Sequence, residues 1–412
     1  MTSAKEILRS PFGTISNEKA QIDAVRMREY RLNRVRQQLT QLGYGGLLTA
    51  DPINILYTTG FRNMALYMMR NPSQYVYIPV DGPIVLFDYP GSEHLAEGLE
   101  TIDEVRSGIT VSYGVSGNRL GENAKKFASE IRTLVKKHGG VGSALAIDGI
   151  PPISVIALME EGIKVVDGRT PIERARAVKS EEEIQCLRIS MKIVDEALVK
   201  IRTALQPGIT ENELWSILHQ TNISNGGNYI DTRLLSSGPR TNPFFQEASD
   251  RVIQAGELVV LDTDTVGPFG YYADISRTFY CGEGEPTDEQ RRLYNTAFEH
   301  IEWNASIIKP GMTFREFADK SWEIPKEFFA NRYSAIAHGC GFSSEYPYIV
   351  PKADFDERGF DGVIEENMVL SVESYIGAKG GAEGVKLEQE YLVTPEGVVR
   401  FSDFPFEEKL LY

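Results

Sequence analysis

The chain has 412 residues, 42% of them hydrophobic, and a formal net charge of −15. Its length favours two domains of roughly 150 to 230 residues, and its apolar content is ample for two cores. The acidic charge, without a cluster of Lys and Arg that could neutralise phosphates, argues against a nucleic acid or an anionic membrane as partner. Three widely spaced cysteines predict no disulfide framework, and the absence of a signal-like or membrane-spanning apolar run predicts a cytoplasmic protein.

The first part of the chain alternates helical and extended patterns. After an N-terminal arm without periodicity, Met1–Glu18, apolar residues at helical spacing predict an amphipathic helix over Ala20–Leu42 that ends at Gly43. Strands are predicted at Gly46–Thr49, Tyr75–Ile78, Ile84–Phe87, Ala144–Ile147 and Lys164–Val166, and further helices at Ser92–Leu99, Leu120–His138 and Pro152–Glu161. This alternation favours an α/β domain that covers residues 1–170.

The second part, residues 171–412, opens with a long helix predicted over Glu173–Thr203. Its signals are a capping box, Ser180 with Glu183, and an apolar stripe along one face. Further helices are predicted at Glu211–Asn222, Asp288–Ile308 and Thr313–Ala330, and strands at Tyr229–Leu235, at Leu258–Asp264 and in alternation with turns over Tyr333–Phe401. The predicted domain boundary lies just before the long helix.

Three aspartates lie in one predicted hairpin, Leu261–Phe279. On an extended strand Asp262 and Asp264 fall on the same face, Gly and Pro supply the turn, and the returning chain brings Asp274 opposite them. Carboxylates so close together need a neutralising cation, so the hairpin predicts a pair of divalent metal ions. The competing interpretation is that these are ordinary turn and surface residues.

Three later residues complete an oxygen-rich set. His338 is flanked by glycines, whereas the other four histidines lie within or at the end of predicted helices. Glu373 and Glu388 lie in apolar strands, where a buried carboxylate is costly unless it is paired or bound to a metal. Three Asp, two Glu and one His suit Mn, Fe or Zn and argue against a purely thiolate site.

The order of these residues resembles that of the pita-bread family of metallopeptidases and creatinases, which includes methionine aminopeptidases and Xaa-Pro dipeptidases. The resemblance runs from about Glu173 to the end of the chain, and the preceding α/β domain is similar to the creatinase N-terminal domain. It implies an α+β pita-bread catalytic domain with a binuclear metal site. The implied metal ligands are Asp262, Asp264, Asp274, His338, Glu373 and Glu388.

Within this family the chain resembles the dimethylsulfoniopropionate lyases. The resemblance rests on Gly226–Glu247, the Asp262/Asp264 doublet, Tyr333 five residues before His338, and the ending Lys386–Thr394. It implies a homodimer whose two metal ions, iron first and Mn or Zn as alternatives, assist removal of an α-proton from a small zwitterion, followed by β-elimination. It also places a catalytic base six residues after the metal-binding histidine.

This chain has Ser344 at that position, and a neutral serine is a poor base. The predicted substitutes are the adjacent Glu345 and Tyr333. A hydrolase of peptide or other C–N bonds stays open as the alternative function, although two histidines typical of the peptidases are missing from Gly238–Phe245 and from position 345. A binding module without catalysis is the third reading. An aromatic wall for a sulfonium is predicted at Phe244, Phe245, Phe342 and Tyr346.

Overall fold

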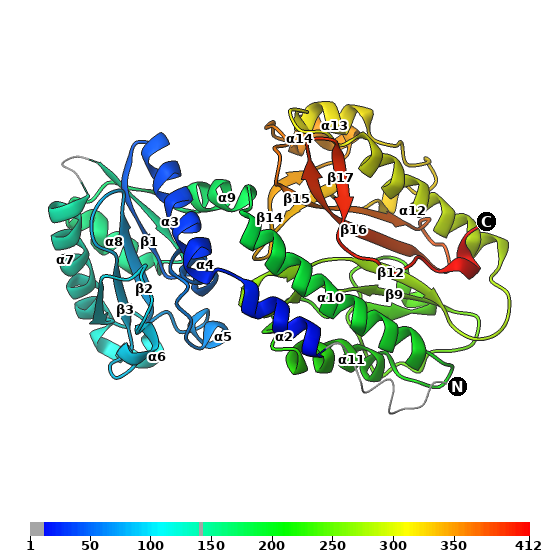
Figure 1. The fold of residues 1–412 in the computed structure, drawn as a ribbon, viewed down its shortest axis with the longest axis horizontal. Coiled ribbons are helices and arrows are strands. Elements are labelled where there is room, and N and C mark those ends of the chain that lie inside the picture. Colours follow the sequence, from blue (N-terminus) through cyan, green and yellow to red (C-terminus); the bar gives the residue numbers. More distant parts are fainter. Residues whose placement is uncertain (1–11, 140–142) are drawn as a thin grey trace. The chain divides into compact units, whose positions relative to one another are not determined.

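The computed structural model describes residues 12–139 and 143–412, and the chain forms two compact units (Figure 1). The first unit is Asp23–Arg176. The second is Ala177–Tyr412 together with the described part of the N-terminal segment Met1–Ile22. No helix in the described ranges is long and apolar enough to cross a membrane.

The first unit is built on a mixed sheet with strand order β4-β3-β2-β1-β5-β6. Its strands are β1 (Tyr44–Thr49), β2 (Tyr75–Pro79), β3 (Val85–Asp88), β4 (Glu104–Ser107), β5 (Ala144–Asp148) and β6 (Val165–Asp167). Its helices are α3 (Ala24–Gln41), α4 (Pro52–Thr59), α5 (Ala65–Met68), α6 (Tyr113–Ser116), α7 (Leu120–His138), α8 (Pro152–Glu160) and α9 (Arg169–Ala177). The apolar face of α7, with Phe127 and Ile131, joins Leu48 and Tyr77 of the sheet in one core, so the expected α/β domain is confirmed.

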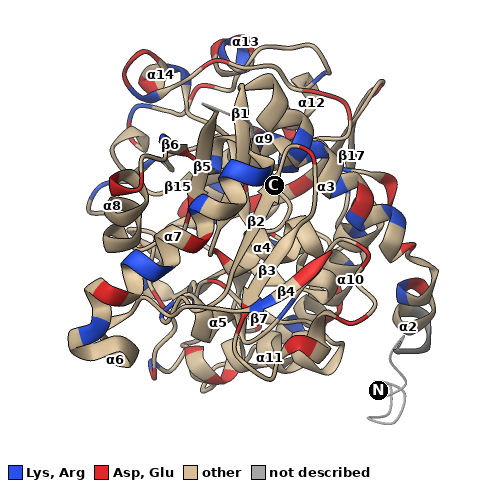
Figure 2. Cartoon of the chain, turned by 90° about the vertical axis from the view of Figure 1, so that its left-hand side faces the viewer, with Lys and Arg blue, Asp and Glu red and all other residues tan. Residues whose placement is uncertain are grey.

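Charges of both signs alternate on the surface of this unit. Figure 2 shows Lys and Arg beside Asp and Glu on β4 and on the helices. Arg106 pairs with Glu104 at 2.7 Å, and Lys126 pairs with Glu122 at 2.6 Å. Such exposed pairs contribute little stability, but they neutralise the surface locally.

Two predictions for the N-terminal part are wrong. Part of the segment predicted as an arm is helical, α2 (Phe12–Gln21), while residues 1–11 lie outside the described ranges. A new helix, α3, then begins because the Asp23 side chain accepts a hydrogen bond from Arg26 N. The helix predicted at Ser92–Leu99 is only a 3-10 turn, Glu93–Ala96.

The second unit combines three sheets with helices. Their strand orders are β11-β10-β7, β12-β9-β8 and β14-β13-β15-β16-β17. The strands are β7 (Tyr229–Ile230), β8 (Leu235–Ser237), β9 (Leu258–Asp262), β10 (Thr265–Val266), β11 (Tyr272–Ala273), β12 (Ser276–Tyr280), β13 (Ala337–Cys340), β14 (Ser344–Ile349), β15 (Val369–Ile376), β16 (Val385–Thr394) and β17 (Gly397–Arg400). The helices besides α2 are α10 (Glu181–Ala204), α11 (Glu211–Ser224), α12 (Asp288–Ile307), α13 (Phe314–Lys320) and α14 (Lys352–Arg358).

Two predicted helices of this unit are shorter than expected. The predicted helix Glu173–Thr203 is interrupted between α9 and α10, because Val178 forms a β-bridge with Met368. The predicted capping box of Ser180 and Glu183 then starts α10. Helix α13 ends at Lys320 instead of Ala330, because Trp322 N donates to Asn304 Oδ1 and Pro325 follows.

Helix α12 packs against β15 and β16 and carries a buried histidine. His300 Nδ1 lies 2.8 Å from Ser374 Oγ on β15. Burial lowers the pKa of His300 to about 4, so the imidazole is neutral at pH 7.

Acid is therefore expected to destabilise the second unit through His300. In the unfolded chain a histidine has a pKa of about 6.5, so only the unfolded state takes up this proton as the pH falls toward 4. The stability contributed by neutral His300 is complete above pH 6.5, and about 2 kcal/mol of it is lost between pH 7 and pH 5. Urea unfolding of wild type and His300→Gln at both pH values measures the effect, and equal losses in the two proteins would contradict it.

Candidate metal centre

The three aspartates converge as predicted, but not on one strand. Strand β9 ends at Asp262 and β10 begins at Thr265 in a different sheet, and Asp264 lies between them with a φ of 34°. Asp274 lies in the matching gap between β11 and β12, where Ser276 pairs with Asp262. One carboxylate oxygen from each aspartate lies within 4.8 Å of the others. The three aspartates therefore meet where the chain crosses from one sheet to another, and not because they alternate along a single strand.

The other three predicted ligands come from the five-stranded sheet. His338 lies on β13, and Glu373 on β15 is directly opposite Glu388 on β16. His338 Nε2 is 3.2 Å from Glu388 Oε1, 3.5 Å from Glu373 Oε1 and 3.7 Å from Asp274 Oδ2. Asp274, His338 and Glu388 form a second group of candidate ligands, so Asp274 belongs to both groups.

Hydrogen bonds orient the His338 ring. Nδ1 lies 3.0 Å from Gly339 O, and because a carbonyl only accepts, Nδ1 carries the proton of that bond. Ser344 Oγ is a second neighbour of Nδ1, at 3.1 Å. These contacts turn Nε2 toward the carboxylates, as in metal sites whose histidine is held through its other nitrogen.

The carboxylates are buried and two of them have open oxygens. Among the described residues, Asp274 Oδ1 and Glu373 Oε1 are buried without a hydrogen-bond partner. Burial, followed by the charges of Glu388 and Asp264, raises the pKa of Asp274 well above its ordinary range. Burial lowers the pKa of His338, but Glu388 and Glu373 outweigh it and raise this pKa to about 9. The site therefore attracts cations, and its oxygen-rich donor set with one imidazole fits divalent metal ions.

Lys386 lies inside the same cluster and was not predicted as part of the site. Its fully buried Nζ is 2.8 Å from Glu388 Oε2 and 2.9 Å from Glu373 Oε2. Burial lowers the pKa of Lys386, but Asp262 and the two glutamates raise it well above its ordinary value, so the amine stays charged. Residues two apart on a strand share a face, and this signal places Lys386 beside Glu388.

The ligands open onto a cavity of about 350 Å³. The predicted residues that line it are Asp262, Asp264, Asp274, Tyr333, His338, Ser344, Glu373, Glu388 and Phe245, and the others are Asp231, Thr232, Arg233, Leu234 and Glu247. Phe245 is 62% exposed, with a φ of 71°, and its ring lies 5.6 Å from that of Tyr333. These two rings form the aromatic wall of the cavity.

The other predicted wall residues do not reach the cavity. Phe244 is buried and stacks on Tyr375 at 5.5 Å. Phe342 packs on Tyr271 at 4.6 Å, and Tyr346 stacks on Phe360.

The structure does not favour Glu345, which was predicted as a catalytic base, for that role. Successive side chains of β14 point to opposite faces, so Ser344 lines the cavity and Glu345 does not. Glu345 Oε1 instead lies 2.9 Å from Lys179 Nζ in a fully buried pair, and Oε2 accepts a hydrogen bond from Phe342 N. Tyr333 lines the cavity, but burial and then Glu373 raise its pKa far above the ordinary value, which disfavours a phenolate base.

We expect Glu345→Gln to reduce stability rather than chemistry. The substitution leaves Lys179 buried beside a neutral partner, which costs roughly 3–5 kcal/mol. Urea unfolding measures the loss, and the double variant Lys179→Met/Glu345→Leu should recover part of it because no charge is then left unpaired. A Glu345→Gln protein with wild-type stability and no turnover would restore the catalytic assignment.

Asp231 is one of the cavity residues that the sequence analysis did not predict. Its backbone N donates to Asp264 O at 3.0 Å, and the next residue, Thr232, bonds the Asp264 carboxylate. Part of Asp231 is exposed to solvent. Its pKa is nevertheless raised to about 6, first because the rest of the side chain is desolvated and second because of the negative charge of Asp264. A carboxylate with such a pKa on the cavity wall is suited to accept a proton.

Comparisons with known proteins agree with this architecture. Residues 185–395 match metallopeptidase family M24, and residues 31–178 match the creatinase/prolidase N-terminal domain. The chain is 36% identical to dimethylsulfoniopropionate lyase DddP of Roseovarius nubinhibens, over 94% of this chain and 88% of that protein. It is 27% identical to the Xaa-Pro dipeptidase of Pyrococcus furiosus, over 90% of this chain and 97% of that protein.

Solved structures show the same fold. The Xaa-Pro dipeptidase from Bacillus anthracis superimposes with a TM-score of 0.74 and 22% identity, over 92% of this chain and 99% of that one. The prolidase from Pyrococcus horikoshii gives a TM-score of 0.73 at 22% identity, over 92% and 99% of the two chains.

Proposed function

This chain belongs to metallopeptidase family M24, with the creatinase-like and pita-bread domains of binuclear metal enzymes, and on that premise we propose that it is a lyase. Its proposed substrate is dimethylsulfoniopropionate or a similar small zwitterion, and the products are dimethyl sulfide and acrylate. The observation that carries the proposal is a cavity that joins the carboxylate and histidine donors to the wall of Phe245 and Tyr333. Among the described lining residues His338 is the one histidine, which is unlike the peptidase pattern.

The six predicted residues would hold the two ions, and Asp274 belongs to both groups of candidate ligands. Iron is the first expectation, and Mn or Zn are alternatives. When bound, two divalent ions would neutralise the carboxylates and stabilise the negative charge that develops on the substrate as it loses a proton. The open oxygens of Asp274 and Glu373 support this assignment.

The chain's own residues orient the substrate and move the proton. The sulfonium packs against the faces of Phe245 and Tyr333, which attract a cation through their ring electrons. Asp231 then takes the α-proton. The electron pair of the broken C–H bond forms the C=C bond. The C–S bond breaks, and dimethyl sulfide leaves with the electron pair of that bond. Asp231 finally returns its proton to water.

A metal-dependent hydrolase of peptide or other C–N bonds is the second candidate. It is supported by the family and by the 27% identity to a Xaa-Pro dipeptidase. A hydrolase consumes water and releases an amine or amino acid, whereas the lyase releases a volatile sulfide. The products therefore distinguish the two functions.

The deciding experiment is headspace analysis of dimethyl sulfide from iron- or manganese-loaded protein supplied with dimethylsulfoniopropionate. We expect sulfide and acrylate in equal amounts, and none from an Asp274→Ala control. Protein that is replete with metal yet releases no sulfide would overturn the lyase, and dipeptides and cyclic amides would be tested next.

We further propose a homodimer. Apolar side chains on and beside α5 are exposed, namely Met64, Leu66, Tyr67 and Met69. Contiguous exposed apolar side chains are typical of interaction surfaces. Sedimentation analysis tests the proposal, and a monomer at micromolar concentration would contradict it.

A further inference from the structure

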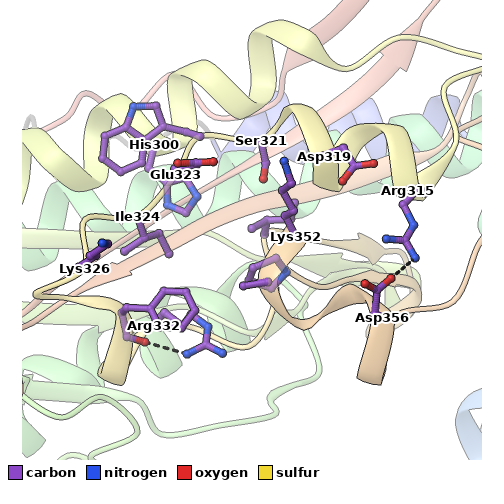
Figure 3. A pocket seen from close by; sticks show the side chains of 15 residues that line it. His300, Arg315, Asp319, Ser321, Glu323, Ile324, Lys326, Arg332, Lys352 and Asp356 are labelled. Carbon is purple, nitrogen blue, oxygen red and sulfur yellow. Dashed lines mark hydrogen bonds and ion pairs between the residues drawn. The ribbon is translucent and has the colours of Figure 1, made fainter.

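A second cavity, of about 710 Å³, lies in the second unit and shares no described lining residue with the metal-site cavity (Figure 3). Its walls come from α12, α13, the segment 321–332 and the beginning of α14. On β15, Glu373 faces the metal centre, and its neighbour Ser374 faces α12, where it contacts His300. The cavity therefore lies behind the sheet that carries the metal ligands.

A buried polar atom marks one wall of this cavity. His300 is 1% exposed, and its Nδ1 is occupied by Ser374 Oγ. Its Nε2 is buried without a hydrogen-bond partner in the described part of the chain. Leaving such an atom unsatisfied costs about 1–3 kcal/mol. The imidazole lines the cavity through the small part of its ring that is exposed, whereas Nε2 itself is covered by the surrounding protein.

The same wall provides apolar surface. The Trp322 ring lies 5.5 Å from the His300 ring, and Ile324, Ile336 and Pro351 continue the lining. In Figure 3, His300 and Ile324 lie on one side of the cavity, Arg315 and Asp356 on the other, and Lys352 between them. A ligand with a compact apolar body fits this side.

Some of the charged side chains that line the cavity form ion pairs, and others do not. Arg315 pairs with Asp356 at 2.6 Å, and Arg332 pairs with Asp354 outside the lining. Lys326 and Lys352 make no ion pair in the described ranges, and both are exposed. The remaining carboxylates, Asp319 and Glu323, are also exposed and keep their hydration on the rim. The lysine ammoniums are thus available to an anionic group.

We propose that this cavity binds a small organic anion with an aromatic or branched apolar body. The body packs on Trp322, Ile324 and Ile336, beside the His300 ring. The anionic group, a carboxylate, sulfonate or phosphate, lies at Lys352.

The test uses two fluorescent probes with the same ring system and the metal-loaded, full-length protein. 8-Anilinonaphthalene-1-sulfonate has an aromatic body, an N–H group and an anion, and N-phenyl-1-naphthylamine lacks the anion. We expect saturable binding of the sulfonate, weakened about tenfold by Lys352→Met because a charge-assisted contact is lost. The uncharged probe should bind equally to wild type and Lys352→Met.

Two further variants locate the binding. Ala353→Trp fills the cavity from an exposed helical position and should abolish saturable binding of both probes. Lys320→Met, an exposed lysine outside the lining, is the matched control and should bind both probes as wild type does. Wild-type affinity in both Ala353→Trp and Lys352→Met, or no saturable binding to wild type, would overturn the proposal.

Discussion

Asp274→Ala is expected to remove most of the bound metal and to lower turnover by a factor of at least about 10³. Asp274 alone belongs to both groups of candidate ligands, and its Oδ1 has no hydrogen-bond partner among the described residues. Losing it therefore affects both ions, whereas losing another ligand affects one group. Each ion contributes several kcal/mol of charge stabilisation, which corresponds to this loss of rate.

Metal analysis after dialysis, together with the sulfide assay, measures both effects. Wild type is expected to hold about two ions per chain. Asp81→Asn is the matched control, because Asp81 is exposed and lies in the other unit. An Asp274→Ala protein that retained its metal would contradict the shared-ligand assignment.

Asp231→Asn is expected to lower turnover by about 10²–10⁴, the usual contribution of a positioned base, while metal content stays unchanged. The amide keeps the shape of the side chain but cannot take the α-proton. Ser344→Ala provides the comparison from the same cavity. It removes only a neighbour of His338 Nδ1, which retains Gly339 O, so we expect a much smaller loss.

The pH profile separates a base from a merely structural residue. Burial and Asp264 raise the pKa of Asp231, so the ionised form that accepts a proton is populated above about pH 6. Wild-type turnover should rise with pH through the range in which the Asp231 carboxyl group ionises, and the residual activity of Asp231→Asn should lose this rise. Equal activity losses in Asp231→Asn and Ser344→Ala would contradict the assignment.

The sequence contains enough information to predict which residues meet at the candidate metal centre. Asp274, His338, Glu373 and Glu388 carry recognisable neighbours, namely turns, glycines and apolar strands, and their order along the chain does not depend on the packing of the sheets. The expectation that Asp264 shares one extended strand with Asp262 is wrong. Nothing in the local sequence pattern predicts the positive φ of Asp264 or the change of sheet between β9 and β10.

The catalytic assignments depend on tertiary packing and were less predictable. Glu345 is adjacent to a cavity residue, but only the position of Lys179 on the other side of β14 shows what Glu345 pairs with. Asp231 precedes Asp264 by 33 positions, and their proximity follows from the antiparallel pairing of Ile230 with Thr265. Neither contact has a sequence motif.

Lys386 also affects the charge balance of the site while the chain folds. A nascent chain that buries so many carboxylates together would meet strong repulsion as it folds. Lys386 belongs to the polypeptide itself, so part of this repulsion is cancelled before any ion arrives from the cell. The chain therefore carries a counter-charge of its own within the cluster of carboxylates.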